Sequence, residues 1–171
     1  IELQMDKLNL SDIKIKDFDV AVNEGVVRII NPFNDYIDNM IAMLDVESIR
    51  NKDLRILIDP MYGVSKTALQ TLLMTARCEI DVIHDSHDTN FGGRMPSPSE
   101  DTLHHLKNLV VEKGYDLGIG TDGDADRLGI IDELGEYIHP NKILVLLYYY
   151  LLKYKKWLGP VVRNLATTHQ L

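Results

Sequence analysis

The fold is decided by residues 117–132, which read LGIGTDGDADRLGIID. Two short apolar runs flank an acidic segment that contains one glycine and ends in an arginine. Short apolar runs bounded by turn residues are typical of buried strands. We therefore expect strands at residues 117–120 and 128–132, joined by a loop at residues 121–127.

The chain before this loop alternates between helical and strand-like patterns. Apolar residues either recur at helical spacing or form short runs in these segments: residues 33–44, 54–59, 64–76, 80–83 and 98–113. Strands that alternate with helices predict a sheet covered on both faces. The expected hairpin at residues 128–138 adds antiparallel pairing. We expect an α/β fold with three α/β/α layers and a mixed, mostly parallel sheet of about four strands.

Local signals mark the ends of the later elements. Ser97 is a good N-cap and Pro98 suits a first helical position, so a helix is expected to begin there. Gly114 is a good residue to end it. A further helix is expected from Asn141, and the apolar run from Val161 predicts a final strand.

Composition narrows the class of partner. The chain has 171 residues and a formal net charge of -8, which argues against a nucleic-acid-binding protein with a basic face. The longest apolar run, residues 143–152, is about half of what a membrane span needs, so no membrane partner is expected. The single cysteine, Cys78, cannot form an internal disulfide, and a cytoplasmic location is expected.

The organisation of the chain suggests a piece of a longer protein. It begins at Ile1 without a methionine and stops soon after the apolar run from Val161. We expect residues 1–24 to be the tail of a preceding domain or a linker. Residues 25–138 would then form a metal-binding α/β domain, and residues 139–171 would be the truncated start of a following domain.

The acidic loop predicts a metal site. Asp122, Asp124 and Asp126 can curl around one ion in a loop that contains a glycine, and Mg²⁺ prefers carboxylates, water and phosphate oxygens. The planar guanidinium of Arg127 suits bidentate contact with a phosphate. A cation beside an arginine forms an electrophilic clamp for a phosphoryl group. Such sites favour the carboxyl edge of an α/β sheet.

Alternative interpretations of this loop remain open. The three aspartates and Glu133 match positions one, three, five and twelve of an EF-hand calcium loop. Arg127 occupies position six, where glycine is required, and the flanks are strand-like, which disfavours calcium. The loop could also be a solvated acidic turn without an ion. A third alternative is a non-catalytic module that uses a divalent cation structurally.

A second candidate region is the long segment from His84 to Ser97. Loops of this length are usually functional or mobile. Its potential ligands are His84, Asp85, His87 and Asp88, which suit either a transition-metal site or a solvated loop. Arg94 has the chemistry to bind a phosphate or to pair with a neighbouring carboxylate, and we include it with Arg127 as a candidate phosphate-binding residue.

The acidic loop with its flanks resembles that of a known enzyme family. Residues 118–127 with Gly129 and residues 132–135 look like the metal loop of the α-D-phosphohexomutases, which include phosphoglucomutases and phosphomannomutases. Residues 59–64 resemble the opening of that family's second domain. Residues 91–98 resemble its Phe-Pro…Pro-x-Pro-Glu loop, although Gly92 replaces the proline. The resemblance runs from about Gly25 to the end of the chain.

The resemblance implies a four-domain enzyme that moves phosphate between the 1- and 6-positions of a hexose through a phosphoserine and a bisphosphate sugar. In this family Mg²⁺ is held by three aspartates, here Asp122, Asp124 and Asp126, and the arginine, here Arg127, contacts the phosphosugar. The chain lacks the family's Thr-Ala-Ser-His-type nucleophile motif and its sugar-reading motif. We therefore expect a fragment that supplies the Mg²⁺ site and is inactive without the missing domains. The resemblance disfavours a glucosamine substrate, because that subgroup usually has a different loop in this domain.

Overall fold

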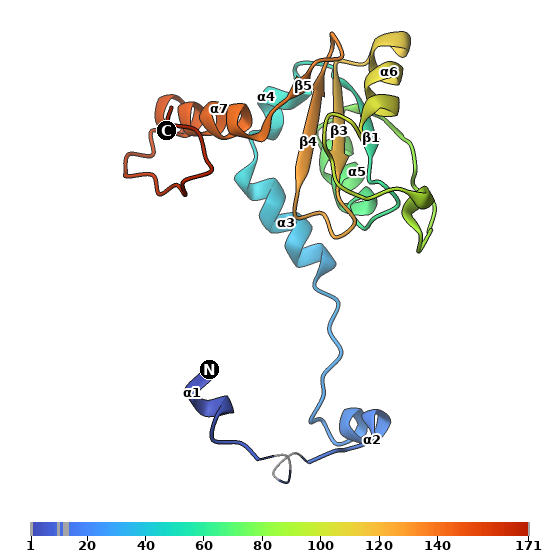
Figure 1. The fold of residues 1–171 in the computed structure, drawn as a ribbon, viewed down its shortest axis with the longest axis vertical. Helices are drawn as coiled ribbons and strands as arrows, with labels where there is room; N and C mark the ends of the chain where they lie inside the picture. The colour runs from blue at the N-terminus through green and yellow to red at the C-terminus, as the bar shows by residue number, and fades with distance from the viewer. Residues whose placement is uncertain (1, 10, 12–13, 171) are drawn as a thin grey trace. The chain divides into compact units, whose positions relative to one another are not determined.

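The computed structural model describes residues 2–9, 11 and 14–170 (Figure 1). The chain divides after Tyr36 into two compact units. The first contains helices α1 (Glu2–Met5) and α2 (Phe18–Asn23). The carboxylate of Asp17 caps α2 by accepting hydrogen bonds from the backbone N–H groups of Asp19 and Val20 at 3.0 and 3.2 Å. Helix α3 (Phe33–Met43) spans the point of division.

The second unit is built on a five-stranded sheet with the order β2-β1-β3-β4-β5. The strands are β1 (Arg55–Asp59), β2 (Glu79–Val82), β3 (Leu117–Thr121), β4 (Leu128–Asp132) and β5 (Tyr137–Ile138). Strands β2 and β3 pair parallel with β1, whereas β4 pairs antiparallel with both β3 and β5. The expected mixed α/β sheet is confirmed, with five strands where about four were expected.

Helices cover both faces of this sheet (Figure 1). Strand side chains alternate between the two faces, so each face has apolar side chains that a helix can bury. Leu57 and Ile131 belong to a buried cluster with side chains of α6 (His104–Lys113). Ile56 and Ile58 belong to a second cluster, against which side chains of α4 (Val46–Arg50) and α5 (Lys66–Thr75) pack. The two clusters separate three layers, as expected for an α/β/α fold.

Two glycines of β3 allow α6 to lie close to the sheet. A Cβ atom added at Gly118 would lie 2.9 Å from Val110 Cγ2, and one added at Gly120 would lie 2.6 Å from Leu103 Cδ2. Atoms in a packed interior do not approach so closely without strain. The alternation of glycine with larger residues in β3 therefore fixes which face of the strand receives α6.

The start of α6 differs from the sequence prediction. Helix α6 begins at His104, so neither Ser97 nor Pro98 lies at its start. Thr102 instead closes a local turn, because its hydroxyl accepts from the Ser99 backbone N–H at 2.9 Å and donates to the Ser97 carbonyl. Pro98 is buried, and its carbonyl accepts the Tyr137 hydroxyl at 3.1 Å. These contacts hold the segment outside the helix.

The predicted end of α6 is confirmed. Gly114 adopts the left-handed conformation with φ 65° and ψ 47°, and its N–H donates to the carbonyl of Val110. Glycine enters this conformation without the steric cost that a Cβ atom imposes.

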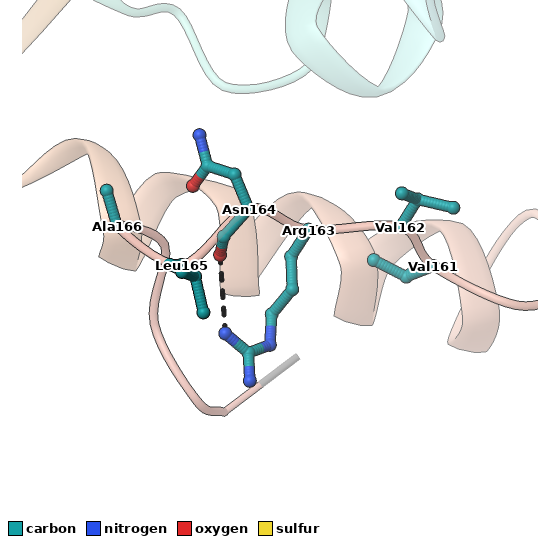
Figure 2. A pocket seen from close by; sticks show the side chains of 6 residues that line it. All are labelled: Val161, Val162, Arg163, Asn164, Leu165 and Ala166. Atoms are coloured by element: carbon teal, nitrogen blue, oxygen red, sulfur yellow. Dashed lines mark hydrogen bonds between the residues drawn. The ribbon is translucent and has the colours of Figure 1, made fainter.

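The segment after α7 (Pro140–Lys153) also differs from expectation. The predicted strand from Val161 is wrong, because residues 161–170 form no strand. Residues 161–164 lie against α7 and line one hollow with it. Residues 161–166 line an open hollow of about 900 Å³. Figure 2 shows their side chains, and Arg163 donates to the carbonyl of Asn164 at 3.3 Å. A strand needs a neighbouring strand for its backbone hydrogen bonds, and the helix offers none.

Among the described residues, no helix is long and apolar enough to cross a bilayer.

Tyr115 follows α6 and contacts residues of strands β1 and β2. It is 3% exposed, its hydroxyl donates to Asp81, and the guanidinium carbon of Arg55 lies 5.0 Å from its ring centroid. Burial, followed by the hydrogen bond to Asp81 and the charge of that residue, raises the pKa of Tyr115 to about 12. The folded protein therefore favours the neutral phenol.

Stability should fall steeply in alkali for this reason. The contribution of Tyr115 is complete below its unfolded-state pKa of about 10 and is lost as the pH rises toward 12. We expect the free energy of unfolding to lose about 2–3 kcal/mol across this interval, measured by urea unfolding. A Tyr115→Phe variant should lack this part of the alkaline loss, and an unchanged pH profile in the variant would contradict the assignment.

Candidate metal and phosphate site

The acidic loop leaves the sheet at its carboxyl edge. Strand β3 ends at Thr121, and the parallel strand β1 ends beside it at Asp59, which is paired with Gly120. The hydroxyls of Thr121 and Ser65 are buried and lie 2.7 Å apart, which ties the start of the loop to the start of α5. This is the edge at which open α/β sheets commonly bind ligands.

Three carboxylates converge in this loop. Asp122, Asp124 and Asp126 each offer one oxygen, and these oxygens lie within 4.8 Å of one another. Asp122 is buried, whereas the other two are exposed. No other group of three or more acidic, histidine or cysteine side chains with such spacing occurs in the described part of the chain.

The spacing and chemistry of this group suit magnesium. Six oxygens at about 2.1 Å from Mg²⁺ lie roughly 3 Å apart when adjacent and about 4.2 Å apart when opposite, so a small closure of the loop would bring the carboxylates to one ion. Glu133, which an EF-hand would require, follows β4, whereas the loop precedes that strand. Glu133 is also not part of the cluster, so the geometry removes the EF-hand alternative.

The electrostatics of the loop reveal unbalanced negative charge. The hydrogen-bonded carboxyl of Asp122 and then the charges of Asp124 and Asp122 raise the pKa of Asp126. For Asp122, burial is the largest single influence and acts to raise the pKa. The hydrogen bonds from the backbone and side chain of Arg127 and the contact with Asp126 outweigh burial and lower it. A divalent cation would relieve the repulsion that raises the pKa of Asp126.

Arg127 is anchored inside the loop. Its Nε donates to Asp122 Oδ2 at 2.6 Å and lies 3.5 Å from Asp126 Oδ1, while its Nη1 donates to Ser97 Oγ at 3.3 Å. The hydrogen bond to Asp122 raises the pKa of the guanidinium, which keeps it charged. Because the side chain is 64% exposed, an anion in solution can reach it.

A hollow of about 470 Å³ opens beside the loop. It combines the Asp126 carboxylate and the Arg127 guanidinium with the hydroxyl-bearing residues Ser97, Ser99 and Tyr137. The charged and hydroxyl groups suit a phosphate, whereas the rest of the lining is apolar: Pro98, Leu128, Pro140, Ile143 and Leu144. The hollow in Figure 2, in contrast, has only one charged lining residue, Arg163.

The potential ligands between His84 and Asp88 do not converge. Asp85 forms an ion pair with Lys66, and Asp88 accepts from the backbone N–H groups of Asn90 and Gly92 at 2.8 and 2.9 Å. His84 points instead to Asp59. These contacts order the loop, and they do not support the transition-metal alternative.

Arg94 has no carboxylate partner among the described residues. Its Nη2 lies 3.1 Å from His84 Nε2, and His84 Nδ1 lies 2.9 Å from the buried carboxylate of Asp59. No sequence pattern predicts that these three residues come together. Asp59 and His84 are 25 positions apart, and no short pattern connects residues at that separation. The only local indication of a site is the position of Asp59 at the end of a predicted strand, before a proline.

These features define an α/β/α domain with an acidic, cation-compatible loop at the carboxyl edge of its parallel strands. The sequence profile described as "Phosphoglucomutase/phosphomannomutase, alpha/beta/alpha domain II" matches residues 34–135. The chain belongs to the phosphoglucomutase/phosphomannomutase family, which confirms the resemblance stated above.

Curated relatives extend this result. A probable phosphoglucosamine mutase from Methanosarcina barkeri is 34% identical over 130 residues, which are 76% of this chain and 29% of the relative. A phosphoglucomutase/phosphomannomutase from Thermococcus kodakarensis is 32% identical over 143 residues, which are 84% of this chain and 30% of the relative. The chain thus spans less than a third of either relative. These names belong to the relatives and do not test the expectation that disfavours glucosamine for this chain.

A solved structure shows the same fold. The putative phosphomannomutase from Thermus thermophilus superimposes with a TM-score of 0.67 at 22% identity, over 72% of this chain and 29% of that one. At 22% identity this match shows a shared fold and nothing about function.

Proposed function

We propose that this chain supplies the magnesium site of a phosphohexomutase, which interconverts hexose 1-phosphate and hexose 6-phosphate through a phosphoserine and a bisphosphate sugar. The observation that carries the proposal is the convergence of the Asp122, Asp124 and Asp126 carboxylates beside Arg127. Membership of the mutase family supports the reaction class.

The residues have separate roles in this proposal. The three aspartates would hold Mg²⁺, which supplies Lewis-acid stabilisation of phosphoryl oxygens. Arg127 is fixed on one side by Asp122 and presents its exposed guanidinium to the phosphosugar. Arg94 is a second candidate phosphate contact because no described carboxylate neutralises it.

The proposal treats this chain as part of a larger enzyme. The sequence has no Thr-Ala-Ser-His-type nucleophile motif, and the chain spans 29% and 30% of the two relatives described above. We propose that the phosphoserine and the sugar-reading groups come from other domains of the same polypeptide, in the cytoplasm. Domain boundaries at residues 24 and 138 are part of this proposal.

Two assays test the proposal. The chain alone should bind Mg²⁺, measured by calorimetry, but should not convert glucose 1-phosphate, measured by ³¹P NMR, which resolves the 1- and 6-phosphates. A longer product of the same reading frame that contains a serine motif should convert it in the presence of Mg²⁺. Turnover by the 171-residue chain would refute the fragment interpretation, whereas a longer product with no activity on any hexose phosphate would favour a non-catalytic cation-binding module.

The identity of the sugar needs a separate measurement. Relatives named for glucosamine and for glucose or mannose have nearly the same identity to this chain, 34% and 32%. This region therefore does not separate the substrates by similarity. The longer product should be compared on glucose, mannose and glucosamine 1-phosphates in one assay.

A further inference from the structure

A buried carboxylate, a histidine and an arginine form a chain at the same sheet edge as the acidic loop. Asp59 is 2% exposed, and its Oδ1 accepts the backbone N–H of Met61 at 2.8 Å. Its other oxygen, Oδ2, lies 2.9 Å from Nδ1 of His84. The opposite nitrogen of that ring, Nε2, lies 3.1 Å from Nη2 of Arg94.

The chemistry of the end groups determines the proton position on His84. A guanidinium has only donors, so Nε2 of His84 must accept the hydrogen bond from Arg94. The ring then carries its proton on Nδ1 and donates it to the carboxylate of Asp59. In this tautomer a buried negative group orients the ring, and the ring orients the arginine.

The surroundings of His84 restrict its movement. Its side chain is 15% exposed, and the rings of Tyr62 and His105 each lie with their centroids 5.2 Å from its own. Nδ1 of His105 lies 3.3 Å from Nε2 of His84, so it is a second group beside the same lone pair. The backbone of His84 is left-handed, with φ 49°, and its carbonyl accepts the N–H of Tyr62 at 2.8 Å.

Arg94 lies on the part of the loop that contacts the acidic loop. A Cβ atom added at Gly123 would lie 3.0 Å from Phe91 Cε1 and 3.7 Å from Pro96 Cγ. Arg94 is situated between these two contacts in the sequence and is half-buried. The guanidinium of Arg94 is held by a neutral ring and has no carboxylate partner in the described residues. It therefore remains able to bind an external anion.

We propose that His84, oriented by Asp59, is a positioning residue that holds Arg94 ready to bind a phosphate group of the substrate. The inference rests on the proposed function, since it takes the phosphosugar as the ligand. It adds two residues, Asp59 and His84, that do not touch the ligand themselves. Their effect on binding passes through the single hydrogen bond from Arg94 to His84 Nε2.

Two substitutions separate positioning from a purely structural role. In His84→Gln the amide oxygen can replace Nε2 and accept from Arg94, but the bond to Asp59 is lost. In His84→Asn the amide nitrogen can replace Nδ1 and donate to Asp59, but the side chain no longer reaches Arg94. Asparagine also tolerates the left-handed backbone better than glutamine does. A purely structural role therefore predicts that the asparagine variant has both the higher thermal stability and the higher phosphate affinity of the two.

The test is a titration of the isotope-labelled chain with inorganic phosphate, without metal, followed at the Arg94 Nε–H signal in NMR spectra. An Arg94→Gln variant identifies that signal, and the Arg127 signal serves as an internal control. We expect His84→Asn to weaken phosphate binding at Arg94 by about fivefold and His84→Gln to weaken it by less than about twofold. Thermal unfolding should rank the variants in the opposite order. The ¹⁵N shifts of His84 should show a protonated Nδ1.

Each outcome has a clear meaning. A protonated Nε2 in the neutral ring, or equal phosphate affinity in the two His84 variants, would overturn the positioning role while leaving Arg94 a phosphate ligand. No shift of the Arg94 Nε–H signal on addition of phosphate would remove Arg94 from the site and the inference with it. Failure of the chain to bind Mg²⁺ would count against the proposed function, but it would not alter the phosphate titration.

Discussion

An Asp124→Asn variant should bind Mg²⁺ at least about tenfold more weakly than the parent chain, because groups that only support metal ligands already contribute that much affinity. Asp124 is exposed, and within the described residues it makes no hydrogen bond that holds the loop together, unlike Asp122, which is buried and bonded to Arg127. The metal-free variant should therefore fold normally. The charge of Asp124 also raises the pKa of Asp126, so its removal relieves repulsion in the absence of metal.

Calorimetric titration with Mg²⁺ and thermal unfolding without metal measure the two effects. Glu133→Gln is the matched control, since it removes an exposed acid from the neighbouring turn at the other end of β4. The control should bind Mg²⁺ as the parent does. Equal affinity in Asp124→Asn and the parent chain would show that the ion, if bound, is held elsewhere. A weakened Glu133→Gln would restore the EF-hand alternative.

A Gly63→Ala variant should lose about 3 kcal/mol of folding free energy, which is the upper end of the usual cost of overpacking. The added Cβ would lie 2.4 Å from the carbonyl oxygen of Gly123 and 2.7 Å from its Cα. Both are backbone atoms, so no side-chain rotation can make room. The carbonyl of Gly123 also accepts the N–H of Val64 at 3.1 Å, and separation of the two loops would break that bond.

The consequence should extend to the metal site. Gly123 lies between Asp122 and Asp124, so a displaced backbone at this residue would spread the carboxylates. We expect a lower midpoint in urea unfolding together with weaker Mg²⁺ binding. Gly159→Ala is the control, because a Cβ atom there would meet no described atom within 4 Å. A stable Gly63→Ala variant with parental Mg²⁺ affinity would show that the two loops can separate without consequence.

Several elements could be predicted because their signals are local. The strands β1, β3 and β4 follow from short apolar runs, and the end of α6 follows from a single glycine. The carboxylates of the acidic loop are only two positions apart, so their convergence needs only one tight turn. Periodicity and turn chemistry act over a few residues, which is the range that a single sequence reveals.

The tertiary structure alone decided the remaining features. Helix α6 begins at His104 and not at Pro98, because the carbonyl of Pro98 accepts a hydrogen bond from Tyr137, 39 positions away. This long-range contact overrides a locally favourable helix cap. The run from Val161 forms no strand because it lies against α7 instead of a sheet edge. Arg94 pairs with a histidine that is itself oriented by Asp59, because packing brings the end of β1 against the segment from His84 to Ser97. The sequence by itself thus determined the acidic loop and its chemistry, whereas only packing determined the groups that surround it, because side-chain partners far apart in the chain are selected by the shape of the whole core.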